Sequence, residues 1–545
     1  MKKTALLFRL LLIVAMVAGL TAISHIYAAP APLVLTMFSE DINPDDTGFT
    51  DPVAQEITKR TGVKLKIEYV VGDPQQKKTL MIASGDYPDL IFQKGANQYV
   101  DAKAFIDLTP YIDRYGKNVK ALYGPYLKRL RYSQQDKSIY SLGCYGVGSE
   151  VWEPSGVQLQ HAVAKELGYP KMKTVKDFEA AIKAYKDKHP TIDGQPTIGL
   201  SLIADDWRIL ISVTNQAVFA TGGPDDGEYY IDPKTKKAVY HYTRPEEQEY
   251  FRWLNHMNDV GLLDPECFVQ KYDQYQAKIA SGRVLALTDA WWEYDGAQKA
   301  LKEAGKFDRA YGSYPIVLND KYKRADLQNP GYSGTWGIAI TTKCKDKLKA
   351  FKLLNWWCSD EAQVLVNWGI KGKNYTIENG KRVMSPTEWA RLNGDPNYKR
   401  ETGIGQYVYP FPQRGDGLKD KTGSTYTTKT PQSIIDKYTP IEKEVLAGYN
   451  AKMWMDLFPK DKEFPLKTWP AGWQVQTPTD ASYEVPRQKC QDIIWKRIPE
   501  MIMAKPEKFD GLWDSMMAEL KAAGMDQMVV IFNQSLANVI KLWND

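Results

Sequence analysis

Apolar and polar residues follow two alternating periods in the segment that begins near residue 33. Residues 33–38 are an apolar run typical of a buried strand, residues 63–69 alternate as a half-buried strand does, and residues 88–92 form a third apolar run. Helical patterns span residues 52–61 and 75–84, between these runs. This alternation of strands and helices along the chain predicts a parallel sheet covered by helices on both faces. Ligands of such sheets bind outside the carboxyl ends of the strands.

A second region with the same signals begins near Glu150. Residues 174–177 resemble a capping box, followed by apolar side chains at helical spacing. Residues 228–240 predict a hairpin around an Asp-Pro-Lys turn, and residues 245–261 predict a helix that ends at a glycine. Residues 336–340 favour a strand, and the tail is helical. The chain is therefore expected to be an α/β protein with two cores.

The first 28 residues predict export. Lys2 and Lys3 precede an apolar run of 11 residues, and Ala28 closes the segment, which is the pattern of a secretory signal peptide (residues 1–28). A membrane anchor is the alternative, but the run is shorter than the roughly 20 residues that span a bilayer. Because no Cys lies near Ala28, a lipid-anchored mature N-terminus is not predicted. We expect a periplasmic, extracellular or cell-surface protein.

Composition excludes some classes of partner. The 545 residues include 71 Lys and Arg and 66 Asp and Glu, and the net charge of +5 falls to +2 without the three basic residues of the signal segment. So small an excess gives no reason to expect a nucleic-acid partner. The five Cys show no metal-ligand spacing, and one or two disulfides remain open. Aromatic residues make up 12% of the chain, which suits either cores or a binding surface.

The sequence contains no motif that specifies an enzyme. The HExxH, GxSxG and Walker A patterns are absent, and the four His beyond the signal segment are dispersed. Carboxylates are too numerous to isolate a glycosidase pair, because the separation of such a pair is a three-dimensional quantity. We therefore predict no catalytic residues, no metal and no cofactor.

The positive signal is aromatic residues beside polar ones at the edges of predicted loops. One group directly follows the apolar strand at residues 284–287, a second follows the apolar run 198–203, and a predicted turn at residues 311–315 carries a third. Sugar rings present C–H faces that stack on aromatic rings, and their hydroxyls pair with carboxylates and guanidinium groups. The alternative for each ring is core packing. The candidate ligand-binding residues are Trp291, Trp292, Glu293, Trp336, Trp207, Asp206, Arg208, Trp152, Tyr314 and Tyr145.

Several segments resemble one protein family. Residues 82–92, IASGDYPDLIF, are similar to a segment of the bacterial extracellular solute-binding proteins, family 1, which serve ABC importers. Residues 105–112, 260–266, 279–284 and 359–363 are similar to further segments of the same pattern. Residues 367–381 and the tail at 513–543 resemble the large, oligosaccharide-type branch that includes alginate-binding proteins. The similarities follow in the family's order over essentially the whole mature chain.

The resemblance implies two α/β lobes of the periplasmic-binding-protein type (type II), each a mainly parallel sheet flanked by helices, which close on a sugar oligomer about a hinge. We expect the N-lobe at 29–148 plus 312–372, and the C-lobe at 149–311 plus 373–545 with a helical C-terminal extension. Such a protein is expected to be a monomer that delivers an oligosaccharide to the permease subunits of an ABC importer, without catalysis. In the family, the position of Trp291 and Trp292 supplies a stacking aromatic.

The sequence departs from the family pattern twice. Gram-positive members carry a lipidated Cys after the signal segment, which is absent here. Alginate-binding relatives hold calcium in an acidic loop after the helix that corresponds to residues 175–188. Here that loop, residues 189–194, has one carboxylate, too few for a calcium cage, so no calcium is predicted. Arg208, Arg283 and Arg414 leave an acidic sugar such as a uronate oligomer open.

Two other functions remain as alternatives. A secreted polysaccharide hydrolase or lyase would use the same aromatic cleft and would need an acid/base pair, for which Glu293 and Asp206 are nominated by their proximity to Trp. A peptide-binding receptor is the weaker alternative, because aromatic residues also bind peptides. Product formation from a polysaccharide separates the enzyme from both binding proteins.

Overall fold

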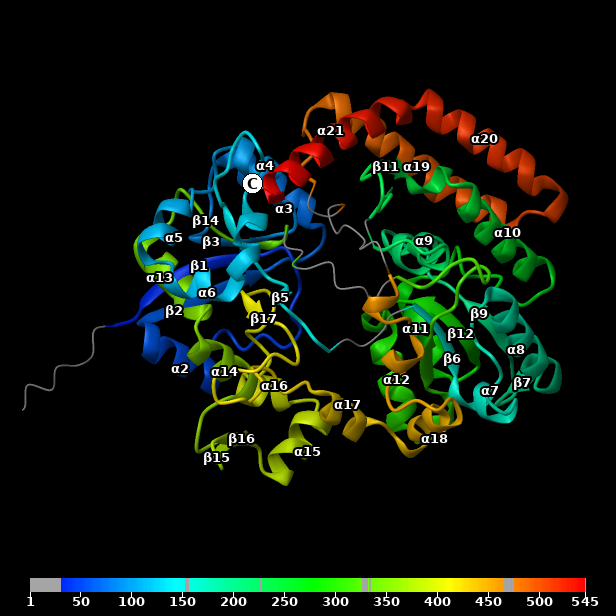
Figure 1. Cartoon of the computed structure of the whole chain (residues 1–545), viewed down its shortest axis with the longest axis horizontal. Helices are drawn as coiled ribbons and strands as arrows, with labels where there is room; N and C mark the ends of the chain where they lie inside the picture. The colour runs from blue at the N-terminus through cyan, green and yellow to red at the C-terminus, as the bar shows by residue number, and fades with distance from the viewer. Residues whose placement is uncertain are drawn as a thin grey trace, which may run out of the picture.

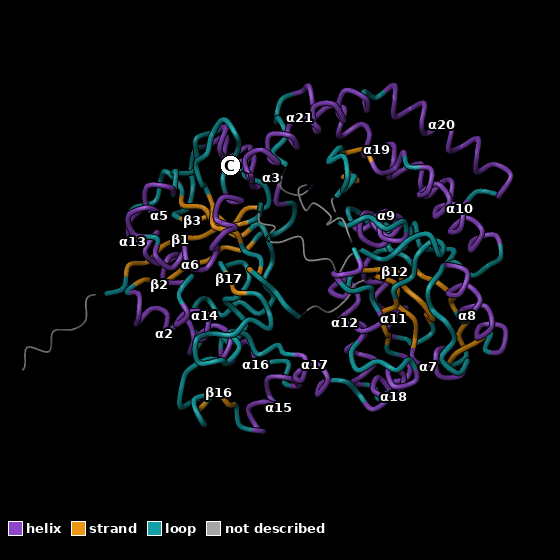
Figure 2. The backbone as a smooth tube through the Cα atoms, viewed as in Figure 1, coloured by secondary structure: helices purple, strands orange, loops and turns teal. Residues whose placement is uncertain are grey.

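Two β-sheets, each wrapped by helices, organise the chain (Figure 1). The computed structural model describes residues 31–151, 156–225, 227–325, 332, 335–464, 472 and 475–544. The predicted signal peptide, residues 1–28, and the candidate Trp152 lie outside the described residues. Strands occupy the centre of each lobe and helices surround them (Figure 2).

The first lobe contains a five-stranded mixed sheet in the order β2-β1-β3-β14-β4. β1 is parallel to both β2 and β3, whereas β14 is antiparallel to β3 and β4. The strands are β1 (Leu33–Ser39), β2 (Val63–Tyr69), β3 (Leu90–Gln93), β4 (Ser141–Gly143) and β14 (Gly337–Ile340). The helices around them are α2 (Pro52–Thr61), α3 (Pro74–Ser84), α4 (Asn97–Asp101), α5 (Thr109–Tyr115), α6 (Lys117–Tyr123), α13 (Lys347–Trp357), α14 (Asp360–Trp368), α15 (Pro386–Gly394) and α16 (Tyr398–Thr402).

Local signals account for the elements at the start of this lobe. Asp51 caps α2 by accepting a hydrogen bond from the Ala54 N–H at 2.9 Å, and Pro52 takes the first helical position. Gly62 ends the helix with φ 67°, a conformation that glycine adopts without strain. The predicted β-α-β-α-β order of this segment is confirmed.

The second lobe contains a four-stranded sheet in the order β13-β6-β12-β9. β9 and β12 are parallel, and β6 is antiparallel to β12 and β13. The strands are β6 (Gly156–Gln160), β9 (Ile198–Ser201), β12 (Val284–Asp289) and β13 (Tyr311–Tyr314). The helices around them are α7 (His161–Glu166), α8 (Val175–Lys188), α9 (Asn215–Ala220), α10 (Pro245–Asp259), α11 (Tyr272–Ala280), α12 (Trp291–Glu303) and α18 (Pro440–Gly448). The predicted capping box at Thr174 is present at the start of α8.

The remaining described strands form four two-stranded pairings. They are β10 (Tyr229–Ile231) with β11 (Ala238–Tyr240), β7 (Thr191–Ile192) with β8 (Gln195–Pro196), β15 (Thr376–Glu378) with β16 (Lys381–Val383), and β5 (Gly146–Val147) with β17 (Gln413–Arg414). The first of them is the predicted hairpin at residues 228–240, which is confirmed.

Three helices at the C-terminus extend the second lobe toward the first. α19 (Ala481–Met503), α20 (Phe509–Ala522) and α21 (Met525–Asn544) pack their apolar faces onto the core of the second lobe. α21 then reaches the first lobe, where the Arg129 guanidinium lies 4.3 Å from the ring centroid of Trp543. Figure 1 shows these helices crossing the top of the molecule, with α17 (Pro431–Lys437) between the lobes at the bottom.

The strands of each sheet run mainly in one direction, as predicted, and one strand in each is reversed: β14 in the first lobe and β6 in the second. Two other predictions about the fold are corrected. Residues 311–314, predicted as a turn, form strand β13, which pairs with β6 and so belongs to the second lobe. Segment 398–411, predicted in the second lobe, packs in the core of the first, where Phe411 stacks on Trp357 with ring centroids 3.8 Å apart. This packing buries the apolar face of α13, which would otherwise be exposed to water.

All five cysteines are buried free thiols, so the disulfides that the sequence left open do not form in the structure. Along the part of the chain that the structure describes, none of the helices is both long and apolar enough to cross a membrane.

Candidate functional site

The first group of candidate residues lies at one edge of the second sheet. β9 and β12 are parallel, so their carboxyl ends meet at the same edge. The loop after β9 carries Asp206, Trp207 and Arg208, and α12 begins directly after β12 with Trp291, Trp292 and Glu293. Together with Tyr272 at the start of α11, we refer to these seven residues as the second-lobe cluster. The crevice outside parallel strand ends is where ligands of α/β sheets bind.

Three tryptophans of the second-lobe cluster are exposed. The rings of Trp207 and Trp292 stack, with centroids 5.9 Å apart and planes inclined at 28°. Their exposed fractions are 43% and 45%, and that of Trp291 is 47%. Trp291 and Trp292 were predicted at a loop edge but occupy the first turn of helix α12. The helix holds these aromatic faces outside the core, where a ligand can reach them.

Arg208 is the centre of the polar contacts in this cluster. Its Nε donates to Glu293 Oε2 at 3.1 Å, and its Nη1 donates to Asp206 Oδ2 at 2.8 Å. Its guanidinium also lies 4.7 Å from the ring centroid of Trp207 and 4.2 Å from that of Tyr272. These contacts hold the Arg208 guanidinium between two carboxylates and two aromatic rings.

Glu293 is the buried member of the cluster, with an exposed fraction of 1%. Burial raises the pKa of this carboxyl, and the neighbouring Arg208 opposes that rise. Within the part of the chain that the structure describes, nothing donates a hydrogen bond to Glu293 Oε1. Beneath it, burial raises the pKa of Asp289 well above its ordinary value, and its carboxyl accepts from Tyr275 Oη at 2.8 Å.

The second group of candidate residues lies at one edge of the first sheet. The carboxyl ends of β3 and β4 meet the amino end of β14, where Gly337 pairs with Gln93 and Gly143. Trp336 precedes β14 and Tyr145 follows β4, and their rings lie 5.9 Å apart at 35°. We refer to these two residues with Asp41, Lys94 and Tyr409 as the first-lobe cluster.

Charged and hydroxyl groups surround the rings of the first-lobe cluster. Lys94 Nζ lies 4.7 Å from the ring centroid of Trp336 and forms an ion pair with Asp41. Tyr409 Oη donates to Asp41 Oδ2 at 2.6 Å. The buried Glu40 beside them accepts from the Lys94 N–H at 2.7 Å. The arrangement repeats that of the second lobe, with an aromatic face beside an ion pair.

Four members of the clusters were not among the predicted residues. Lys94 is the first residue after β3 and Asp41 the second after β1, so the rule that ligands bind at strand ends could have found them. Tyr409 and Tyr272 carry no such signal, because long-range packing brings them in. Among the predicted residues, Tyr314 is not part of either cluster. It is 1% exposed and packs in the core, 5.7 Å from the ring of Trp454, since its segment is strand β13.

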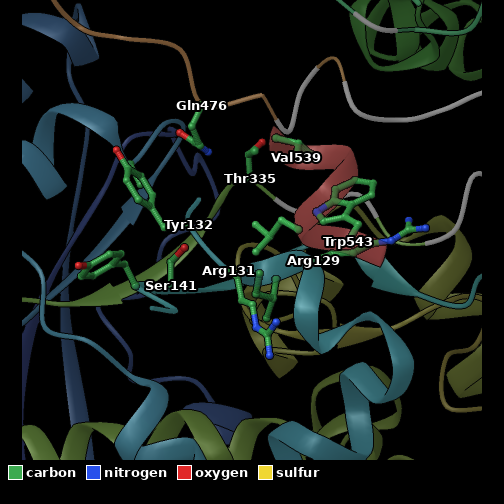
Figure 3. Close-up of a pocket in the computed structure, with 12 residues that line it drawn as sticks. Arg129, Arg131, Tyr132, Ser141, Thr335, Gln476, Val539 and Trp543 are labelled. Atoms are coloured by element: carbon green, nitrogen blue, oxygen red, sulfur yellow. The ribbon is translucent and has the colours of Figure 1, made fainter. Parts of the chain in front are cut away.

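A pocket lies next to the first-lobe cluster, between β4 and α21 (Figure 3). Ser141, Thr335, Tyr132 and Gln476 contribute polar groups to its lining, and Trp543 closes it from α21. Thr335 neighbours Trp336 in sequence. The pocket therefore continues the polar and aromatic surface from the first-lobe cluster toward the C-terminal helix.

Residues 53–368, more than half of the chain, match the family model described as bacterial extracellular solute-binding protein. The lipoprotein LipO of Bacillus subtilis (strain 168) is 23% identical over 423 residues, which cover 75% of this chain and 81% of LipO.

Two solved structures share the architecture. FusA of Streptococcus pneumoniae in complex with kestose matches 92% of this chain and 99% of its own, with a TM-score of 0.66 at 17% identity. The alginate-binding protein AlgQ2 without calcium matches 93% and 98%, with a TM-score of 0.62 at 18% identity. The predicted two-lobe α/β fold and the predicted family are confirmed.

Proposed function

We propose that this chain, which belongs to the bacterial extracellular solute-binding proteins, captures an oligosaccharide and delivers it to the membrane subunits of an ABC importer. The observation that carries the proposal is the pair of aromatic clusters at the strand ends of the two sheets. Each offers exposed rings beside an ion pair, which suits a sugar ring and its hydroxyls.

The names of similar proteins support an oligosaccharide rather than a peptide. FusA is a fructooligosaccharide ABC transporter substrate-binding protein, 25% identical over 249 residues, which cover 42% of this chain and 44% of FusA. AlgQ2 is an alginate-binding protein. We propose that the two lobes hold the sugar between the first-lobe and second-lobe clusters and close on it.

We propose binding without catalysis, since the family is one of substrate-binding proteins. The pair nominated for the enzyme alternative, Glu293 and Asp206, are both held by Arg208 as ion-pair partners. We further propose that the protein acts as a monomer outside the cytoplasm, in the periplasm or at the cell surface, without a nucleic-acid partner. Recovery of the bound glycan unchanged after long incubation tests this against a hydrolase or a lyase.

The decisive experiment removes the exposed stack of the second-lobe cluster. A Trp207→Ala/Trp292→Ala variant is titrated calorimetrically with a panel of oligosaccharide trimers and tetramers. Each stacking contact contributes about 0.5–1.5 kcal/mol, so we expect binding to weaken about 10- to 100-fold. Circular dichroism and the urea midpoint report whether the fold is kept.

Phe307→Ala is the matched control for this experiment. Phe307 is 42% exposed and lies in the second lobe, but it precedes β13 at the opposite edge of the sheet. Its removal should leave the affinity unchanged. An unaltered affinity in the double-tryptophan variant, or an equal loss in the control, would refute the site.

A further inference from the structure

The charges of the second-lobe cluster are unfavourable for an acidic ligand. Arg208 carries the cluster's positive charge, and both Asp206 and Glu293 already hold it. Lys271, which precedes the cluster's Tyr272, pairs with Asp205 at 2.8 Å. Three carboxylates thus face two cations here. An incoming carboxylate would meet a net negative site and would have to displace a carboxylate that is in place.

The charges of the first-lobe cluster are balanced, which leaves no cation among its described residues for a ligand carboxylate. Lys94 is paired with Asp41 and lies over the ring of Trp336. The nearby buried Glu40 is paired with Lys78 at 3.3 Å. Within the described part of the two clusters, each cation therefore has a carboxylate partner.

The sequence also offered Arg283 and Arg414 as possible partners of an acidic sugar, but other groups bind their guanidinium groups. Arg283 precedes β12, at the sheet edge opposite Trp291, and its Nη1 donates to the Pro196 carbonyl at 3.2 Å. Arg414 donates to the Leu122 carbonyl at 3.3 Å and lies 3.9 Å from Asp360. Among the described residues, neither forms a hydrogen bond or an ion pair with a member of either cluster, so Arg208 alone of the three takes part in one.

The hydrogen-bonding capacity of Glu293 indicates which ligand group can lie beside it. Its Oε1 is buried, and no described residue donates to it. An ionised carboxylate only accepts hydrogen bonds, so the missing partner must be a donor. A sugar hydroxyl supplies an O–H donor at this position, whereas a ligand carboxylate placed here would be a second acceptor and would add repulsion.

We propose that the site selects neutral oligosaccharides and discriminates against uronate oligomers. This inference rests on the proposed function. Exposed tryptophan faces take the rings, Glu293 Oε1 accepts from a hydroxyl, and the ion pair of Arg208 with Asp206 and Glu293 repels a ligand carboxylate. The discrimination is electrostatic and is separate from the stacking that provides affinity.

The test uses matched pairs of trimers that differ by the carboxylate. Oligomers of galacturonate and galactose, of glucuronate and glucose, and of mannuronate and mannose are titrated into the mature full-length protein, with kestose as a further neutral probe. We expect the tightest neutral trimer to bind at least about tenfold more tightly than any uronate trimer.

Asp206→Asn removes one negative charge from the second-lobe cluster and keeps a side chain that tolerates the backbone conformation at this position. Asp206 has φ 56°, which Asn adopts readily, and the variant frees one contact of Arg208. We expect the affinity ratio of uronate to neutral trimer to rise about threefold or more. Asp193→Asn is the matched control. Asp193 also has positive φ and an ion pair with a lysine, Lys306 at 2.7 Å, but lies in the β7–β8 hairpin. It should leave the ratio unchanged.

The outcomes separate the two proposals. Tighter or equal binding of a uronate trimer would overturn the selection of neutral sugars alone, and would point to the pocket of Figure 3, which Arg129 and Arg131 line. An unchanged ratio in Asp206→Asn would also overturn it. If no trimer of either kind binds, the proposed function itself fails, and this inference fails with it.

Discussion

The substitution Arg208→Ala removes a guanidinium that contacts two carboxylates and two aromatic rings. Its main consequence falls on Glu293, whose carboxylate stays buried without its partner. The side-chain exposed fractions are 20% for Arg208 and 2% for Glu293, so the pair is closer to a buried than to a surface ion pair. Surface pairs contribute about 0–1 kcal/mol, and removing one partner of a buried pair costs about 3–5 kcal/mol. We expect a loss of about 2–3 kcal/mol in unfolding free energy at pH 7.

The loss should depend on pH in a defined direction. Burial already raises the pKa of Glu293 in the folded state, and removal of Arg208 raises it further. An acid with a raised folded pKa takes up its proton more readily in the folded than in the unfolded protein. The destabilisation of Arg208→Ala should therefore be largest at neutral pH and should shrink as the pH falls toward about 5.

Urea unfolding of four proteins measures the effect: the native chain, Arg208→Ala, Glu293→Gln and the double variant. The glutamine cannot ionise, so the double variant should recover most of the loss, with a coupling free energy of about 2 kcal/mol. Two results would refute the reasoning that Glu293 is a buried charge compensated by Arg208: a loss in Arg208→Ala below about 0.5 kcal/mol, or a loss that is the same at pH 7 and at about pH 5.

Two further predictions concern the core of the second lobe. Burial lowers the pKa of His161 from 6.5 to about 4. The folded state should therefore lose up to about 3 kcal/mol of stability as the pH falls from 6.5 to about 4. His161→Phe should abolish this dependence of the unfolding free energy on pH, as measured by urea unfolding. A slope that persists in the variant would assign the effect to other groups. Gly312→Ala places a methyl group 2.1 Å from the Trp454 ring and should cost about 1–3 kcal/mol. The control Gly511→Ala, in open space on α20, should instead stabilise by about 0.5–1 kcal/mol in thermal unfolding; equal effects would contradict the clash.

Most elements of this protein follow from the sequence by itself. Caps and hydrophobic periods act over three or four residues, which is why the ends of α2 at Asp51 and Gly62 and the capping box at Thr174 are correct. The proximity of Trp207 and Trp292 could also be anticipated, because both follow apolar runs that become neighbouring parallel strands. A family resemblance over the whole chain then indicated the two-lobe fold.

Only the tertiary structure decided which of these residues meet and which become buried. Tyr314 entered the core because its segment pairs with β6, and residues 398–411 cover α13 of the first lobe. Asp41 and Tyr409 join one cluster although 368 positions separate them. Pairing and burial depend on contacts between segments far apart in the chain, and no local period records those contacts. The charge balance on which the proposed choice of ligand rests is likewise a property of the assembled site.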